Sequence, residues 1–149
     1  MSDQIIPRMG AGMVALGLSA VFALAGTVVY TVNATGDYYG DFTASVPILG
    51  VLTLIMAIVP AVLTGVPGRF HWTDACYPLT GVLGMVCALD YISARAESVA
   101  LILGSSLEAG NAAAHQALYT AFAGIGCFLL ATVAACVAGF LTARRPIGR

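Results

Sequence analysis

The sequence predicts an all-α integral membrane protein with four transmembrane helices, both chain ends on one side, and helices 3 and 4 extended into a helical hairpin on the other. Three observations predict this fold. First, 60% of the 149 residues are hydrophobic and only 9% are charged, whereas a soluble domain carries about 25% charged residues. Second, four apolar stretches each supply the roughly 20 residues that a helix needs to cross a bilayer. Third, five of the six arginines fall on one side of these crossings.

The four apolar stretches are expected to be helices. Residues 9–32, 44–66 and 75–89 carry no charge, and no fully ionised side chain lies between Glu108 and Arg144. Backbone groups in lipid need internal partners, and long continuous apolar runs exclude the alternating pattern of a membrane barrel. We therefore expect a single domain over residues 1–149, with helices at about 9–32, 45–66, 75–103 and 106–143. The first stretch is longer than a signal-peptide core, so we expect it to be retained.

The arginines set the predicted orientation, because the chain contains no lysine. Both chain ends and the 67–74 loop share the five arginines Arg8, Arg69, Arg144, Arg145 and Arg149. The positive-inside rule then places both termini in the cytoplasm, in a cell membrane. The Ala-rich, Gly-rich and lysine-free composition favours a bacterial source. The outer side consists of loop 33–44 and the hairpin tip 95–115. With Asp90 at its edge it carries five carboxylates against Arg95, a formal charge of minus four.

Helices 1 and 4 carry small residues at every fourth position, which permits close approach of helices in lipid. The predicted packing residues are Ala11, Ala15, Ser19, Ala23, Ala123, Ala131, Ala135 and Gly139. Such a row drifts around a helix of 3.6 residues per turn, so we expect each helix to have more than one close neighbour. That neighbour is either inside the bundle or in a second copy of the chain. The alternative is that an alanine-rich chain gives such rows by chance.

Helix 2 contains Pro60 in its interior, which predicts a kink. Two interpretations remain open, a plain bend and the flank of a transport site.

The connection between helices 3 and 4 predicts a hairpin. Gly104 is typical of a helix end, and residues 105–108 fit the capping box that starts a helix. This turn would place Asp90 level with Tyr119, whose hydroxyl could donate to it, and Arg95 level with His115. The alternative is an irregular loop with a short re-entrant segment.

The outer side is the candidate site for a ligand or a partner. Its candidate residues are Asp37, Tyr38, Asp41, Asp90, Arg95, Glu97, Glu108, Asn111, His115 and Tyr119. An aromatic belt at the same interface is expected from Tyr30, Tyr38, Tyr39 and Phe42. Three interpretations compete: a cation or small-ligand site, a docking surface, and solvated helix ends. No ligand spacing fixes a metal, and the four cysteines are interpreted as packing residues, so neither metal nor cofactor is predicted.

The leading functional hypothesis is a non-enzymatic, multi-pass membrane protein that assembles with itself or binds another membrane protein. The alternative is a subunit of a transporter or channel for a small solute or cation. A membrane enzyme ranks third, since no nucleophile–base or metal pattern is present. The bilayer is the expected surrounding, nucleic acid is not an expected partner, and the sequence specifies no small-molecule ligand.

Overall fold

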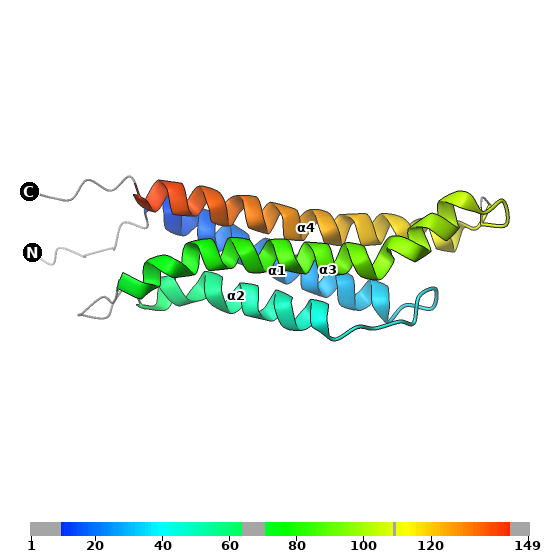
Figure 1. The fold of residues 1–149 in the computed structure, drawn as a ribbon, viewed down its shortest axis with the longest axis horizontal. Helices are drawn as coiled ribbons and strands as arrows, with labels where there is room; N and C mark the ends of the chain where they lie inside the picture. The colour runs from blue at the N-terminus through cyan, green and yellow to red at the C-terminus, as the bar shows by residue number, and fades with distance from the viewer. Residues whose placement is uncertain (1–9, 64–70, 109, 144–149) are drawn as a thin grey trace, which may run out of the picture.

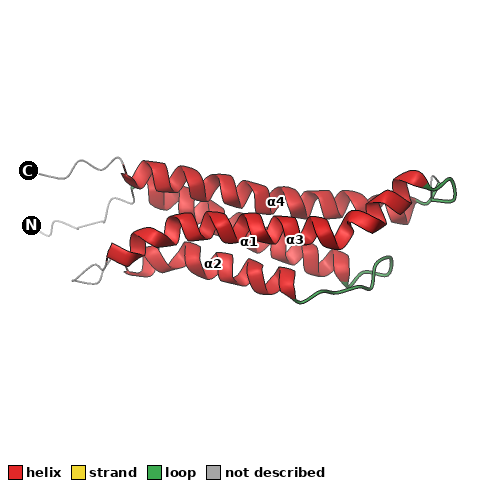
Figure 2. Ribbon diagram, in the orientation of Figure 1, coloured by secondary structure: helices red, strands yellow, loops and turns green. Residues whose placement is uncertain are grey.

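The computed structural model describes residues 10–63, 71–108 and 110–143. They form α1 (Ala11–Ala34), α2 (Ser45–Leu63), the 3-10 turn η1 (His71–Ala75), α3 (Cys76–Gly104) and α4 (Ala112–Ala143). The described residues contain no strand, so the all-α class is confirmed, as the red helices of Figure 2 show. All four α-helices are long and apolar enough to cross a membrane. Arg8, Arg69 and the three arginines after residue 143 lie outside the described residues.

The helices pack side by side as an elongated bundle (Figure 1). α1 packs against α2 and α4, and α3 packs against the same two neighbours, whereas α1 and α3 barely touch. The order around the bundle is therefore α1, α2, α3, α4. We call the end that carries residues 35–44 and 105–111 the loop end. There α3 and α4 run on past the ends of α1 and α2 (Figure 1).

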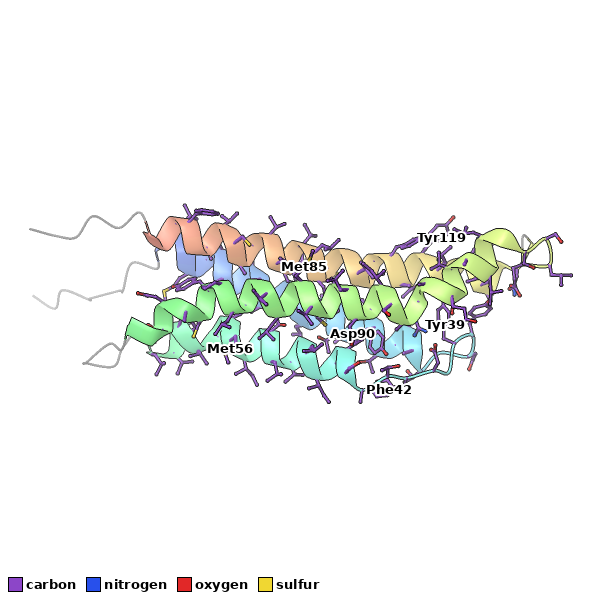
Figure 3. All side chains as sticks on the ribbon, in the orientation of Figure 1. Tyr39, Phe42, Met56, Met85, Asp90 and Tyr119 are labelled. Atoms are coloured by element: carbon purple, nitrogen blue, oxygen red, sulfur yellow. The ribbon has the colours of Figure 1, made fainter. Side chains whose placement is uncertain are left out.

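The helices bury small and polar side chains and expose large aliphatic ones. α1 buries Ala15, Ser19 and Ala23 and exposes the larger Val14, Leu18 and Val21. The side chains in Figure 3 accordingly project from the bundle along its length, Met85 among them. This distribution suits a lipid surrounding, because helices in a membrane associate by close packing rather than by hiding apolar surface from water.

The closest packing joins α1 to α4. The Ser19 hydroxyl donates to the Ala131 carbonyl over 2.8 Å, and the Phe128 ring fills the space that a side chain at Gly26 would need. Of the predicted packing residues, the structure buries Ala15, Ser19, Ala23, Ala131 and Ala135, half-buries Gly139, and exposes Ala11 and Ala123. One end of each row therefore lies outside the interface. This is expected, because residues spaced by four drift around a straight helix of 3.6 residues per turn.

α4 begins at Ala112, not near Ser106 as the sequence predicted. The Asn111 side chain caps it, because Oδ1 accepts from the backbone N–H groups of Ala113 and Ala114. Ser105 instead closes a turn, in which its hydroxyl oxygen accepts from the Leu107 N–H. The predicted capping box was wrong because Asn111, nearly two helical turns later in the sequence, is an equally good cap.

The later start of α4 shifts its pairing with α3. The Tyr91 ring packs against Gly124, and Gly84 packs against Thr132. Asp90 and Tyr91 were predicted to lie level with residues 118 and 119. The observed pairing is about six residues further along α4, or roughly 9 Å at 1.5 Å per residue.

Candidate functional site

The loop end of the bundle contains a buried arginine. Arg95, on α3, exposes 1% of its side chain, and arginine is rarely so buried without a partner. Its Nη1 donates to both carboxylate oxygens of Asp41 over 2.6 Å. Asp41, in the 35–44 loop, keeps 49% of its side chain exposed. The ion pair therefore connects the loop to α3. Its arginine is buried, and its aspartate is half-exposed.

Aromatic rings surround the guanidinium. The Tyr39 ring centre lies 4.0 Å from its Cζ and the Tyr30 ring centre lies 5.9 Å from it, within the range of cation–π attraction. Tyr30 meets Tyr91 edge to face at 4.8 Å, and the Tyr91 hydroxyl lies close enough to Arg95 to interact electrostatically. We call Tyr30, Tyr39, Asp41, Tyr91 and Arg95 the arginine chamber.

The 35–44 loop is held over the chamber by Tyr30. The Tyr30 hydroxyl accepts from the Thr43 N–H over 2.9 Å and donates to the Thr43 carbonyl over 3.0 Å. Gly40 has a φ of +59°, a left-handed conformation that glycine adopts without a steric cost. The turn at Gly40 is followed directly by Asp41, so it sets where the Asp41 carboxylate meets Arg95.

Three donors of the chamber have no hydrogen bond of good geometry to any described residue. They are Nε and Nη2 of Arg95 and the hydroxyl of Tyr39, all buried. An unsatisfied buried donor costs about 1–3 kcal/mol, and more when it is charged. Both bonds to Asp41 use Nη1. The Nε–Nη2 edge of the guanidinium, which can bind an oxyanion with two parallel bonds, makes no hydrogen bond of good geometry, although the Tyr91 hydroxyl lies within interaction distance of the guanidinium.

Asp90 does not bond to Tyr119, contrary to the sequence-based prediction. The Ser45 hydroxyl, at the start of α2, donates to Asp90 Oδ2 over 2.5 Å, and 67% of Tyr119 is exposed. Figure 3 shows Asp90 in the body of the bundle and Tyr119 projecting away from α4. The shifted pairing of α3 and α4 accounts for the difference.

A second polar cluster lies at the tip, beyond the chamber. Glu108 Oε2 accepts from the Asn111 amide over 2.8 Å and from the Tyr38 hydroxyl over 3.4 Å. Desolvation and the Glu108 carboxylate raise the pKa of Tyr38. Partial burial raises the pKa of Tyr39, although the Arg95 charge opposes it. Both tyrosines therefore stay protonated donors at neutral pH.

The ten predicted site residues fall into separate groups of contacts. The structure brings together Arg95 with Asp41, and Glu108 with Asn111 and Tyr38. Asp90 joins α2 instead. Asp37, Glu97 and Tyr119 are exposed and His115 is half-buried. Asp37 and Tyr38 also line a groove of about 320 Å³ between the loop, α1 and α4.

Sequence reasoning missed two walls of the chamber. Tyr30 was assigned to an interfacial belt, but it is fully buried inside the bundle. Tyr91 was not proposed as a site residue. A signal for Tyr91 was present, because it precedes Arg95 by four residues and so shares its helix face. Tyr30 offers no comparable signal, since its contact with Arg95 joins two helices.

Metal chemistry gains no support from the described residues, among which no three His, Cys, Asp or Glu side chains could hold an ion together. The cysteines are free thiols. Cys87 lies in the interior, where its thiol donates to the Val46 carbonyl over 3.3 Å.

No protein-family model, curated protein or solved structure matches the chain. Functional inference therefore rests on the geometry of the bundle and its loop end.

Proposed function

We propose that this protein is a non-enzymatic, multi-pass membrane protein that binds a partner protein with its loop end, on the extracytoplasmic side. Four apolar helices of spanning length are compatible with a multi-pass membrane protein. The distribution of arginines supports cytoplasmic termini. The partner-binding surface is supported by a row of exposed apolar side chains on the part of α3 that continues past the hydrocarbon core.

The lengths of the helices define that region. α2 has 19 residues, about 28 Å at 1.5 Å per residue, close to the roughly 30 Å of a hydrocarbon core. Its first residue, Ser45, bonds to Asp90 of α3. Both therefore lie near one boundary of the hydrocarbon core. Residues 91–104 of α3 continue about 20 Å past that level.

The extension of α3 carries an uncovered apolar row. Ile92, Ala96, Ala100 and Leu103 are exposed, and their spacing of four, four and three residues places them on one helix face. Leu107 follows in the turn with 91% of its side chain exposed. A contiguous apolar surface in water marks an interaction site, so a partner that covers this row would gain stability.

Charge selects the kind of partner. The loop end has five carboxylates against Arg95, a formal charge of minus four, so two copies brought tip to tip would repel each other. The small residues of α1 and α4 that could join copies are mostly buried within one bundle. The partner that fits is a different protein, with Lys or Arg beside apolar side chains.

Transport is less well supported. A pathway for a solute would need polar groups that are free to contact it. The buried hydroxyls of Ser19, Thr53 and Thr80 each donate to a backbone carbonyl instead. This observation favours partner binding over transport.

The test is site-specific photocrosslinking in cells that produce the protein naturally. A benzoylphenylalanine at position 103 or 107 is expected to give one adduct heavier than a dimer of the chain, and mass spectrometry should identify a basic apolar segment at the crosslink. The double variant Glu97→Lys, Glu108→Lys should weaken that adduct at least about tenfold, because it removes the charge complementarity.

The matched control is the same photoprobe at Leu130, which is half-exposed on α4 but lies far from the loop end. No adduct to that partner is expected from this position. A dimer as the sole adduct from positions 103 and 107, or an adduct that the charge reversal leaves unchanged, would contradict the proposal.

A further inference from the structure

The arginine chamber lies at the depth of lipid headgroups. Ser45 begins α2, whose 19 residues match the thickness of a hydrocarbon core, and it bonds to Asp90, so we infer that the edge of the core lies at this level. Arg95 follows five residues later on α3, about 7 Å further out. The headgroup layer extends about 5–7 Å beyond the hydrocarbon on each side. The exposed Phe42 ring lies 6.1 Å from the Tyr30 ring of the chamber, and exposed aromatic side chains are typical of the membrane interface.

The two unpaired N–H groups of Arg95 are suited to bind an oxyanion. Nε and Nη2 are buried and lack a hydrogen bond of good geometry within the described part of the chain. Together they form a planar edge that matches two oxygens of a phosphate or carboxylate. Asp41 satisfies Nη1 alone, with both of its oxygens. Asp41 is therefore a poorer partner for this guanidinium than an oxyanion bound along the free edge.

The surrounding charge excludes a purely anionic ligand as the best fit. Asp37, Glu97 and Glu108 lie at the same end of the bundle, and displacing Asp41 from Arg95 would leave one more free carboxylate. A zwitterion avoids this penalty, because its cationic group can pair with Asp41 while its anionic group pairs with Arg95. One internal ion pair is then replaced by two, with no change in net charge.

We propose that the arginine chamber binds a zwitterionic headgroup in which a phosphate is joined to a primary ammonium, as in phosphatidylethanolamine. Arg95 receives the phosphate along its Nε–Nη2 edge and Asp41 receives the ammonium. The half-exposed Asp41 side chain already faces the surroundings. Tyr39, which stacks on the guanidinium at 4.0 Å, moves aside and its unpaired hydroxyl donates to the phosphate. This site is independent of the proposed partner protein.

Entry of the headgroup requires residues 38–42, which cover Arg95, to move. Thr43 stays fixed by its two bonds to Tyr30, and Gly40 gives the segment backbone freedom. The polar side-chain contacts that must yield are the Arg95–Asp41 pair and the 3.4 Å bond from Tyr38 to Glu108, and the Tyr39 ring must also leave the guanidinium. The first is replaced by ligand contacts and the second is long for a bond between two oxygens.

The test measures lipid retention by the full-length chain in detergent, using native mass spectrometry. The probes are phosphatidylethanolamine, phosphatidylcholine and phosphatidylglycerol with identical acyl chains. Retention of phosphatidylethanolamine should exceed that of the other two about tenfold, since only it offers both a phosphate and N–H donors. Asp41→Asn should remove most of this preference, and Arg95→Lys should weaken retention of all three lipids.

The matched control is Ser93→Ala, which removes an exposed polar group from the helix that carries Arg95 without changing the local charge and should leave the preference unchanged. Circular dichroism verifies that each variant is folded. If Arg95→Lys does not fold, Asp41→Asn still tests the proposal, because the amide of asparagine keeps an oxygen that can accept from Arg95 Nη1.

Free phosphoethanolamine identifies the source of the headgroup. If free phosphoethanolamine displaces the lipid at a concentration similar to that of the lipid, the chamber binds a soluble zwitterion with the same chemistry. If it competes only at concentrations about a hundredfold higher or more, the acyl chains contribute and the ligand is a lipid. Both results support the Arg95–Asp41 chemistry. Equal retention of the three lipids by the unmodified chain, or a preference that survives Asp41→Asn, would overturn the proposal.

Discussion

Arg95 shows how one buried charge organises the loop end. Its guanidinium pairs with Asp41, stacks on Tyr39 and lies beside Tyr30. Removing one partner of a buried pair is costly, because the other charge stays buried without compensation. The two partners here differ in burial, since Arg95 is dry and Asp41 is half-exposed. Loss of the aspartate must therefore cost more than loss of the arginine.

That asymmetry can be measured with two variants. Asp41→Ala leaves a buried guanidinium unpaired and should lower the free energy of unfolding by about 2–3 kcal/mol. Arg95→Met fills the same space with an apolar side chain and leaves a carboxylate that water can reach, so its cost should be about 1 kcal/mol or less. Unfolding by sodium dodecyl sulfate in mixed micelles gives both values. Equal costs would show that the guanidinium is already well hydrated.

At the scale of elements, the start of α4 fixes which residues of α3 and α4 meet. Asn111 caps the helix through two backbone N–H groups, and the 105–111 connection forms a turn instead of a helical first turn. The cap lies outside the apolar core of the bundle. The cost of losing it should therefore resemble that measured for caps in water-soluble proteins.

Two cap variants test this start. Asn111→Ala should destabilise the protein by about 1 kcal/mol, because two N–H groups lose their acceptor. Ser105→Ala, the cap that the sequence predicted, loses one turn contact to Leu107 and should cost less than about 0.5 kcal/mol. The midpoint of thermal unfolding ranks the two variants. The reverse order would place the start of α4 near residue 106.

These elements show where sequence reasoning succeeded and where it stopped. The helices were predictable because their apolar stretches are long and free of charge, and α3 does end at Gly104, although not in the left-handed conformation that a glycine cap favours. The pairing of α3 with α4 could not be predicted. Ser105 and Asn111 are both good caps, and only tertiary packing determines which of them begins α4. That error moved the expected partner of Asp90. The sequence could place the ion-pair partner of Arg95 only in the loop or on α4. A contact between a helix and a distant loop leaves no periodic pattern in the sequence that would identify the residue.

At the scale of the whole molecule, the bundle is held together by small residues inside and surrounded by large aliphatic ones. Ala131 is fully buried, and its carbonyl accepts from Ser19 of α1. Ala123 belongs to the same row of α4 but is exposed. Within this row, Ala131 therefore packs inside the bundle, whereas Ala123 faces the surroundings of the protein.

The two alanines therefore separate packing within the bundle from association between copies. Ala131→Leu should destabilise the monomer by about 1–3 kcal/mol, because the larger side chain forces α1 and α4 apart and breaks the Ser19 bond. Ala123→Leu should change stability by less than about 0.5 kcal/mol. Mass photometry in detergent should give the same particle mass for Ala123→Leu as for the unmodified chain. If the unmodified chain is an oligomer that Ala123→Leu dissociates, the exposed part of the row joins copies. In that case the tip-to-tip repulsion of the acidic loop ends would be avoided by contact along the helices.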